Sequence, residues 1–423
     1  MKRDKSDPLY YAWLHTEFEH IESGKHTALV RFRKRRGGIG SLIVPLSELA
    51  KPGLLSTKLD DLGWKAPPTP AARTNALHAL RDAKPQRCRS VTSVAGWNGD
   101  NFVTPMRTFG PAAKSLRLDP EVIAQSSNSA FGAKGGTLEG WLRGLKSPCR
   151  RSRLLAFSIG VSFGAPLLKL LGDAEGALFH LRGAGTTGKS LAAQAAQSVS
   201  GRANPSDLET WDITPTGLEE LSRLMRDGVV ILDESGRNDG DADSAAGMRR
   251  LVFQLISGRS RRRHSGTAAA LNLTGEAWRN MAITTGELPL NANGQRRDGE
   301  QVRHIEIPVP PRKEGGIFLP SKNSRAPKNG ELAKMVSVTI GSNFGVAIGA
   351  FLATLVPDKA GYALQSEKLV SDFTQRVCDI DDPLELRFGR KFGIDYAGMV
   401  HAARICCAPW TEEAAFRHVR YVY

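Results

Sequence analysis

Residues 177–197 read ALFHLRGAGTTGKSLAAQAAQ, an apolar run, a loop rich in glycine and threonine, and an alanine-rich run. From Gly183 to Ser190 the loop matches the pattern G-x-x-x-x-G-K-[S/T]. Glycines let a chain wrap around phosphates with successive N–H groups pointing inward, and the following helix presents its positive end there. A strand-like run precedes the loop and a helix-forming run follows it. This context favours a phosphate-binding loop over an incidental glycine-rich turn.

The pattern assigns a role to the polar groups of the loop. Lys189 is expected to neutralise the β and γ phosphates of a nucleotide, and Ser190 is expected to ligate Mg²⁺. The residues expected to surround the nucleotide are Gly183, Gly185, Thr186, Thr187, Gly188, Lys189, Ser190 and Leu191.

A second apolar run ends in two carboxylates. Val229 to Leu232 are β-prone, and Asp233 and Glu234 follow them in GVVILDES. Because α/β sheets bind ligands at the carboxyl ends of their strands, both acids are expected beside the loop. Asp233 would hold Mg²⁺ through water, and Glu234 would orient and polarise the attacking water, which indicates a hydrolase. The alternative is an acidic strand end that forms only a salt bridge.

The charge of the chain favours a polyanionic partner. Its 423 residues include 58 Lys and Arg against 43 Asp and Glu, a net charge of +15. Nucleic acid is the commonest partner of such a protein, and scattered solvated cations are the alternative. The length predicts two or three domains.

Cysteine usage and the chain's start indicate a cytoplasmic protein. The five cysteines form no CxxC pair, and the adjacent Cys406 and Cys407 lie on a helix-like run where burial is expected. We therefore expect a reducing compartment and no structural zinc. The charged N-terminus lacks an apolar export signal. The apolar segment 154–172 contains Pro166 and Lys169, which favours a buried helix pair over a membrane span.

The pattern of elements predicts the fold class. Short β-type runs, with a hairpin turn at Asn98-Gly99-Asp100, predict a β-rich (α+β) N-terminal domain over 1–135. Helical runs then lead into strands that alternate with helices, which predicts an α/β core over 136–312. Its expected strands are 177–181, 229–232, 281–285 and 302–307. A Pro- and Gly-rich linker over 313–332 and a helical C-terminal lid over 333–423 complete the expected domains.

Several of these runs together resemble family 927 of the domains of unknown function. They are residues 140–201 around the loop, VVILDES, MAITTGELPL and GEQVRHIEIP, with VTSVAGWNGDNFVTP (91–105) and RFGRKFGIDYAGMV (387–400) near the two ends. The resemblance implies a helicase-like ATPase of the AAA+ class, with a P-loop NTPase core. Such proteins are carried by prophages, plasmids and staphylococcal-type cassette elements. Their ATPase region is similar to that of minichromosome-maintenance helicases.

The resemblance also implies further site residues. In MAITTGE a polar residue should close the strand beside the γ-phosphate. Thr284 and Thr285 are the candidates, and Thr285 is preferred because it ends the strand, although helicases of this class more often have Asn there. An arginine should reach the ATP of a neighbouring subunit: Arg297 is ranked above Arg296 and Arg303. Arg390 is the candidate for a cis-acting arginine from the lid, with a helix-surface charge as the alternative.

A basic stretch lies between the two acids and the strand that ends at Thr285. In the helicases that the chain resembles, a hairpin at this place enters the central channel of a ring and contacts DNA phosphates, and arginine suits such contacts. The alternative is an exposed basic loop. A second cluster, RFRKRRGG (31–38), could guide DNA. The residues expected to bind DNA in the hairpin are Arg259, Arg261, Arg262, Arg263 and His264.

The expected function is therefore an ATP-dependent DNA helicase or translocase of a mobile element or prophage. It would hydrolyse ATP with Mg²⁺ between the subunits of a homo-oligomeric ring, a hexamer by expectation, on single-stranded or forked DNA. One alternative is an initiator or loader that uses ATP only as an assembly switch. Another is a circularly permuted GTPase, since TKLD (57–60) and DESG (233–236) resemble guanine-specificity and switch motifs.

Overall fold

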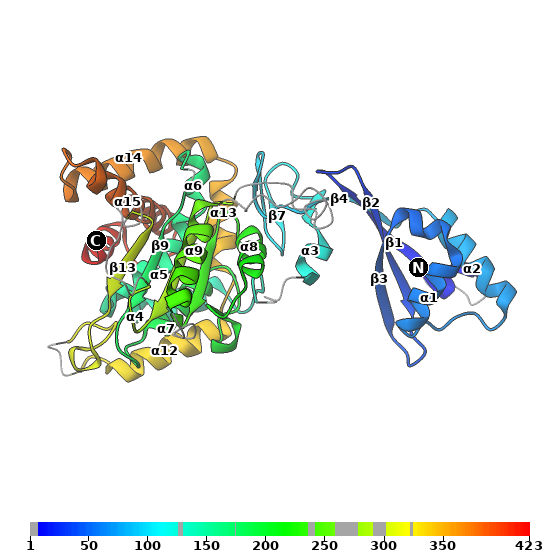
Figure 1. The fold of residues 1–423 in the computed structure, drawn as a ribbon, viewed down its shortest axis with the longest axis horizontal. Coiled ribbons are helices and arrows are strands. Elements are labelled where there is room, and N and C mark those ends of the chain that lie inside the picture. The colour runs from blue at the N-terminus through cyan, green and yellow to red at the C-terminus, as the bar shows by residue number, and fades with distance from the viewer. Residues whose placement is uncertain are drawn as a thin grey trace. The chain divides into compact units, whose positions relative to one another are not determined.

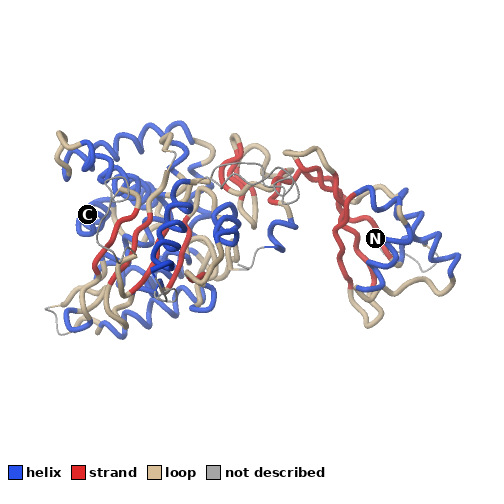
Figure 2. Tube along the Cα trace, viewed as in Figure 1, coloured by secondary structure: helices blue, strands red, loops and turns tan. Residues whose placement is uncertain are grey.

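The computed structural model consists of two compact units, each with its own sheet (Figures 1 and 2). The first unit is Met1–Ser93 with Pro111–Gln125, and the second is Val94–Gly110 with Ser126–Tyr423. The structure describes residues 7–125, 130–173, 175–235, 242–258, 278–290, 302–321 and 325–423.

The first unit is a five-stranded sheet with the helices between β3 and β4 packed on one face. The strand order is β3-β2-β1-β4-β8, with β1, β2 and β3 antiparallel and β4 and β8 parallel to β1. Alternate side chains such as Val30 and Phe32 are buried against Leu55 and Leu80 of the helices. The elements are η1 (Pro8–Tyr10), β1 (Ala12–His20), β2 (His26–Arg33), β3 (Ile39–Pro45), η2 (Leu46–Ala50), α1 (Pro52–Asp61), α2 (Pro70–Asp82), β4 (Arg87–Thr92), β8 (Leu116–Leu118) and α3 (Pro120–Gln125).

Residues 94–110 belong to the second unit, so the division differs from the N-terminal domain expected over 1–135. They form an antiparallel sheet of β5 (Gly96–Asn98), β6 (Asn101–Val103) and β7 (Thr108–Phe109). Asn98 pairs with Asn101, which confirms the predicted hairpin turn. Trp97 explains the division: its backbone N–H donates to Asp227 Oδ2 at 2.9 Å and its Nε1 to the Pro166 carbonyl at 2.9 Å.

The main sheet of the second unit is parallel, with the order β10-β11-β12-β9-β13. Its four longer strands are those expected from the sequence, so the α/β class of this part of the chain is confirmed. The short strand β10 was not predicted. The bounds are β9 (Leu178–Arg182), β10 (Glu209–Thr210), β11 (Val229–Asp233), β12 (Met281–Gly286) and β13 (His304–Pro308).

Helices cover both faces of this sheet. Ile231 and Ile283 face the large core that includes α5 and α7, whereas Val230 and Ala282 face α8 and α9. The helical elements are α4 (Leu138–Arg151), α5 (Arg153–Gly164), α6 (Leu167–Leu170), α7 (Lys189–Gln197), η3 (Pro205–Asp207), α8 (Pro215–Leu224), α9 (Ala242–Ser257), η5 (Arg312–Glu314), α12 (Asn329–Ser342), α13 (Ala347–Leu355), α14 (Lys359–Val377), α15 (Pro383–Arg404) and α16 (Glu412–Val422).

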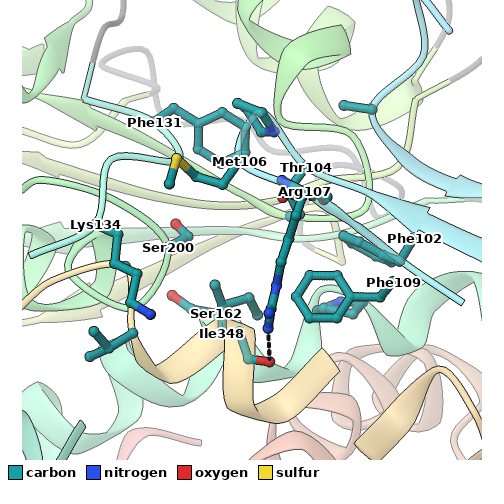
Figure 3. A pocket seen from close by; sticks show the side chains of 18 of the residues that line it. Phe102, Thr104, Met106, Arg107, Phe109, Phe131, Lys134, Ser162, Ser200 and Ile348 are labelled. Atoms are coloured by element: carbon teal, nitrogen blue, oxygen red, sulfur yellow. Dashed lines mark hydrogen bonds between the residues drawn. The ribbon is translucent and has the colours of Figure 1, made fainter. Parts of the chain in front are cut away.

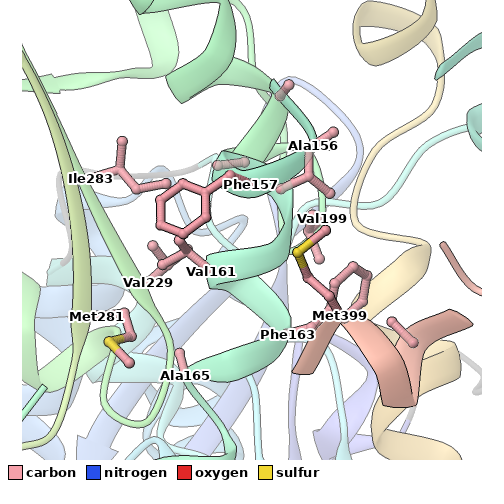
Figure 4. Close-up of a cluster of buried hydrophobic side chains, with 14 of the residues drawn as sticks. Ala156, Phe157, Val161, Phe163, Ala165, Val199, Val229, Met281, Ile283 and Met399 are labelled. Carbon is pink, nitrogen blue, oxygen red and sulfur yellow. The ribbon is translucent and has the colours of Figure 1, made fainter. Parts of the chain in front are cut away.

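Helix α5 is the centre of the core (Figure 4). Its Phe157 ring lies 5.0 Å from the ring of Phe179 on β9 and 5.8 Å from that of Phe392 on α15. A side chain at Gly398 would come within 2.4 Å of the Gly164 nitrogen, so the glycine lets α15 approach α5 closely. Helices α15 and α16 therefore share one core with the sheet, and the helices of the predicted lid lie within the same compact unit.

The apolar segment 154–172 is a buried helix pair, as predicted. Helix α5 ends at Gly164, Pro166 follows, and α6 begins at Leu167. Within the described ranges, none of the helices has both the length and the apolar composition needed to cross a membrane. Cys407 is buried as predicted, but Cys406 is exposed, because it follows the end of α15 with a left-handed φ of 56°.

Candidate nucleotide-binding site

The glycine-rich loop joins the carboxyl end of β9 to the first turn of α7. Gly188 has a φ of 97° and caps the helix, and Thr186 also has a positive φ, 60°. A side chain at Gly188 would come within 2.8 Å of Ile317, and one at Gly183 within 2.8 Å of the Val309 carbonyl. The loop therefore needs glycine at both of these positions.

Lys189 lies inside this loop and is 8% exposed. Its Nζ donates to the Gly183 and Ala184 carbonyls, each at 2.7 Å. Burial lowers the pKa of Lys189, and the negative charges of Glu287 and Asp233 oppose that shift. The ammonium group is thus held by two backbone oxygens that phosphate oxygens could replace.

A chain of hydrogen bonds joins the loop to the two neighbouring strands. Ser190 Oγ donates to Asp233 Oδ1 at 3.0 Å, and Thr285 Oγ1 donates to the same carboxylate oxygen. Thr285 Oγ1 also accepts a bond from the Glu234 N–H at 3.2 Å. Because β12 lies between β11 and β9, Thr285 stands between the acidic strand end and the loop. The fold thus gathers Lys189, Ser190, Asp233 and Thr285 at one edge of the sheet.

The structure distinguishes the two candidate threonines at the end of β12. Thr284 is fully buried and its hydroxyl bonds to His180 Nδ1 at 2.8 Å. The other ring nitrogen, Nε2, lies 3.1 Å from the Leu288 carbonyl. A carbonyl can only accept, so Nε2 carries the proton and the Thr284 hydroxyl donates to Nδ1. Of the two threonines, Thr285 is the one bonded to Asp233.

Two glutamates lie at the same edge, and one of them was missed in the sequence. Glu234 is exposed and has a left-handed φ of 54°, a conformation that costs energy for a residue other than glycine. Glu287 is also exposed, and a side chain at Gly185 would come within 3.0 Å of its Oε1. The motif MAITTGE predicted a role for its threonines but not for Glu287. Glu287 could have been predicted because it follows a strand directly, at the carboxyl end where α/β sheets bind ligands.

Two of the predicted arginines lie at the end of the sheet where the strands begin, whereas the loop lies at the carboxyl ends of the strands. Arg303 precedes β13 and pairs with Glu175 at 2.8 Å. Arg390 pairs with Asp173 and with Glu367, each at 2.9 Å. Asp173 and Glu175 precede β9, whereas the loop follows it, so Arg390 does not reach the loop of its own chain. These carboxylates hold its guanidinium at the start of the strands, so the geometry gives the cis-acting role of Arg390 no support and that role stays a prediction.

The other predicted contacts lie outside the described residues. They are Arg296 and Arg297, which precede β13 in the sequence, and Arg259, Arg261, Arg262, Arg263 and His264 in the basic stretch.

The motif behind the GTPase alternative has a structural role. TKLD lies within α1, where the Thr57 hydroxyl donates to the Gly53 carbonyl at 3.1 Å. Asp60 pairs with Arg73 and, at 3.6 Å, with Arg35. These contacts account for its polar side chains within the packing of the first unit.

A separate cavity of about 610 Å³ lies in the second unit, away from the loop (Figure 3). Phe102, Met106 and Phe131 contribute to its largely apolar wall, and Arg107 Nη2 donates to the Gly349 carbonyl at 3.3 Å. Val229, at the start of β11, also lines it, so the cavity is on the side of the sheet where the strands begin.

The fold and the edge site define an α/β protein with a glycine-rich loop between a parallel strand and a helix. Residues 13–272 match the family model described as "Domain of unknown function (DUF927)", and the chain belongs to this family. The resemblance drawn from the sequence motifs is thereby confirmed. No curated protein matches the chain. Its fold is similar to the solved structure of the SCCmec type IV Cch active helicase, with a TM-score of 0.70, 18% identity, and coverage of 96% of this chain and 72% of that one.

The two threonines of β12 provide a matched pair of variants. In Thr285→Val the Glu234 N–H loses its bond to the Thr285 hydroxyl, so we expect unfolding free energy to fall by about 0.5–1.5 kcal/mol. Because Asp233 and Glu234 also lose their shared anchor, hydrolysis of any nucleotide bound at this candidate site should fall roughly tenfold. Thr284→Val should cost similar stability and leave turnover unchanged. Chemical denaturation and steady-state ATPase assays measure both quantities. Equal turnover in the two variants would contradict a role for Thr285 at the site.

Proposed function

We propose that the chain is an ATP-dependent DNA helicase or translocase of a mobile element or prophage, built on a AAA+ P-loop core. The bonds from Ser190 and Thr285 to Asp233, beside Lys189, carry this proposal. They support a site in which amides, a lysine, a hydroxyl and carboxylates meet at the carboxyl edge of a parallel sheet, as phosphoryl transfer from a nucleotide requires. The likeness to a helicase fold supports the DNA part by analogy.

The residues present fit ATP with Mg²⁺. Ser190 and Asp233 offer hydroxyl and carboxylate oxygens 3.0 Å apart, and oxygen ligands are those that Mg²⁺ prefers. The start of α7 adds N–H groups that have no partner inside a helix and favour a phosphate. Bound there, Mg²⁺ would neutralise charge on the β and γ phosphate oxygens.

Each side chain at this edge then has a task. Lys189 exchanges the Gly183 and Ala184 carbonyls for phosphate oxygens. Asp233 accepts bonds from Ser190 and Thr285 and so fixes both hydroxyls. The Thr285 hydroxyl holds the backbone of Glu234, whose exposed carboxylate orients the attacking water and accepts its proton.

The proposal includes a ring in which DNA lies within reach of basic side chains. The net charge of +15 supports a polyanionic partner. Arg297 remains our candidate for the arginine that reaches a neighbouring subunit, and the basic residues 259–264 remain candidates for DNA contact. We propose a homo-oligomeric ring, a hexamer by analogy with the helicases that the chain resembles.

The test compares ATP hydrolysis with and without single-stranded DNA and follows strand displacement on a forked duplex. We expect hydrolysis of ATP in preference to GTP, stimulation by DNA, and release of the annealed strand. Equal hydrolysis with and without DNA, together with no displaced strand, would refute the motor. Nucleotide-dependent assembly on DNA under those conditions would identify an initiator or loader instead.

A further inference from the structure

The face of the first unit's sheet opposite the helices of residues 52–82 gathers arginines from three strands. Side chains alternate along a strand, and Val30 and Phe32 of β2 point to the helices, so Arg31 and Arg33 point to the other face. Leu29 shares that face and lies in register with Thr16, which lies in register with Arg87 of β4. We define the arginine face as the sheet surface carrying Arg31, Arg33, Arg87, Arg89 and Arg117.

These cations lie close to one another. Burial, together with the positive charges of Arg31 and Arg87, lowers the pKa of His15. His15 is in the irregular part of β1, between the strands that carry those two arginines. Burial and the charge of Arg89 likewise lower the pKa of Arg117. From β2 to β8 the arginine face crosses three strand spacings, about 14 Å in all.

Carboxylates do not balance this charge. Among the described residues, Arg31, Arg87 and Arg89 form no ion pair, and Arg31 Nε is buried without a hydrogen-bond partner. Arg33 donates to the Tyr10 carbonyl at 3.0 Å, and Arg117 donates to the Ala113 and Leu116 carbonyls.

Carboxylates near the sheet are engaged elsewhere. Glu17 and Glu19 lie on the other face of β1, and Glu17 contacts His26 at 2.8 Å. Asp119 is buried against His20 at 3.2 Å. Among the described residues of the first unit, no carboxylate is thus paired with Arg31, Arg87 or Arg89, which leaves these three cations available to an external anion.

Apolar side chains lie among the arginines. Trp13 is opposite Arg31 in the register, Leu29 and Ile43 are half-buried, and Ile39 is 56% exposed. A polyanion whose bases are unstacked offers apolar surfaces beside its phosphates, whereas a duplex keeps its bases stacked inside. A broad sheet face also lacks a helix that could enter a major groove.

We propose that the arginine face binds single-stranded nucleic acid, with arginines on the phosphates and the apolar side chains beside the bases. This site is distinct from the basic residues 259–264 and does not depend on the ATP chemistry proposed above. The first unit would then hold single-stranded nucleic acid independently of the unit that carries the candidate nucleotide-binding site.

The test uses the full chain and a fluorescein-labelled oligothymidylate, with binding followed by fluorescence anisotropy over a salt series. The double variant Arg87→Ser and Arg89→Ser removes two charges from the arginine face. Since single-strand binding releases about 0.7 counterion per phosphate contact, the salt slope should fall by about 1.4 and affinity roughly tenfold. The matched control, Arg81→Ser with Lys84→Ser, removes the same charge at the end of α2 and should bind as the wild type does.

Several outcomes would overturn the proposal. They are wild-type affinity in the Arg87/Arg89 variant, an equal loss in the control, tighter binding of a duplex of the same length, and displacement of the oligonucleotide by anionic lipid vesicles. Circular dichroism checks that the variants fold. ATP hydrolysis without DNA, measured on the same samples, should be unchanged, so a failure of the ATPase proposal is seen separately.

Discussion

Replacing Lys189 by alanine is expected to abolish measurable ATP turnover. The buried ammonium already makes two charged hydrogen bonds to carbonyls at 2.7 Å, and in the nucleotide complex that we propose phosphate oxygens would take their place. A hydrogen bond to a charged group contributes about 1.5–3 kcal/mol, which corresponds to roughly 10- to 150-fold in ATP affinity. Binding of a fluorescent ATP analogue measures this loss directly, and a phosphate-release assay measures turnover.

Lys391 provides a matched control for that variant. It too is buried, and its Nζ donates to a backbone carbonyl, that of Glu175, at 2.7 Å. Glu175 precedes β9, so this lysine lies at the edge of the sheet opposite the loop. Lys391→Ala should lower the thermal midpoint and leave ATP affinity unchanged. If Lys189→Ala and Lys391→Ala lowered affinity equally, the loss would reflect general destabilisation and the phosphate role of Lys189 would be wrong.

Glu234→Gln is expected to separate binding from hydrolysis. The amide keeps the size of the side chain and the backbone bond to Thr285, but it cannot accept a proton from water. Loss of a positioned general base lowers kcat by roughly 10²–10⁴-fold, whereas ATP affinity should stay within about twofold. Single-turnover hydrolysis and analogue binding on the same preparation measure the two quantities.

Glu287→Gln shows which exposed carboxylate performs this step. Glu287 lies beside Gly185 and adds negative charge near Lys189, so its neutralisation should strengthen ATP binding and preserve turnover. The reverse result, with turnover lost in Glu287→Gln and kept in Glu234→Gln, would transfer the water-activating role to Glu287.

Local patterns predicted most of the second unit's sheet and the centre of the candidate site. The loop, the acids after β11 and the threonine that ends β12 each follow an apolar strand, and parallel strands bring their carboxyl ends to one edge. The partners of Arg390 could not be predicted in this way. Asp173 is 217 positions away in the chain, and no periodicity in RFGRKFG indicates such a contact.

The place of residues 94–110 shows the same limit. The hairpin turn at Asn98 follows from local composition. Which of the two units the hairpin joins depends on the bond between Trp97 and Asp227, which are 130 positions apart. The arginine face likewise arises only when β4 pairs beside β1. Arg31 and Arg87 then lie on the same sheet face on either side of β1, although the sequence shows them as separate basic residues.

The discontinuous first unit has a consequence for synthesis on the ribosome. Its edge strand β8 follows the excursion through residues 94–110, so the sheet can close only after about 120 residues have emerged. Residues 94–110 can take their folded position only later, because Asp227, whose side chain accepts a hydrogen bond from the Trp97 N–H, is synthesised 130 residues after Trp97. Until then the apolar side chains of Trp97, Phe102 and Phe109 stay exposed on the nascent chain, where they favour aggregation. A truncated protein that ends near residue 125 would leave these side chains exposed permanently.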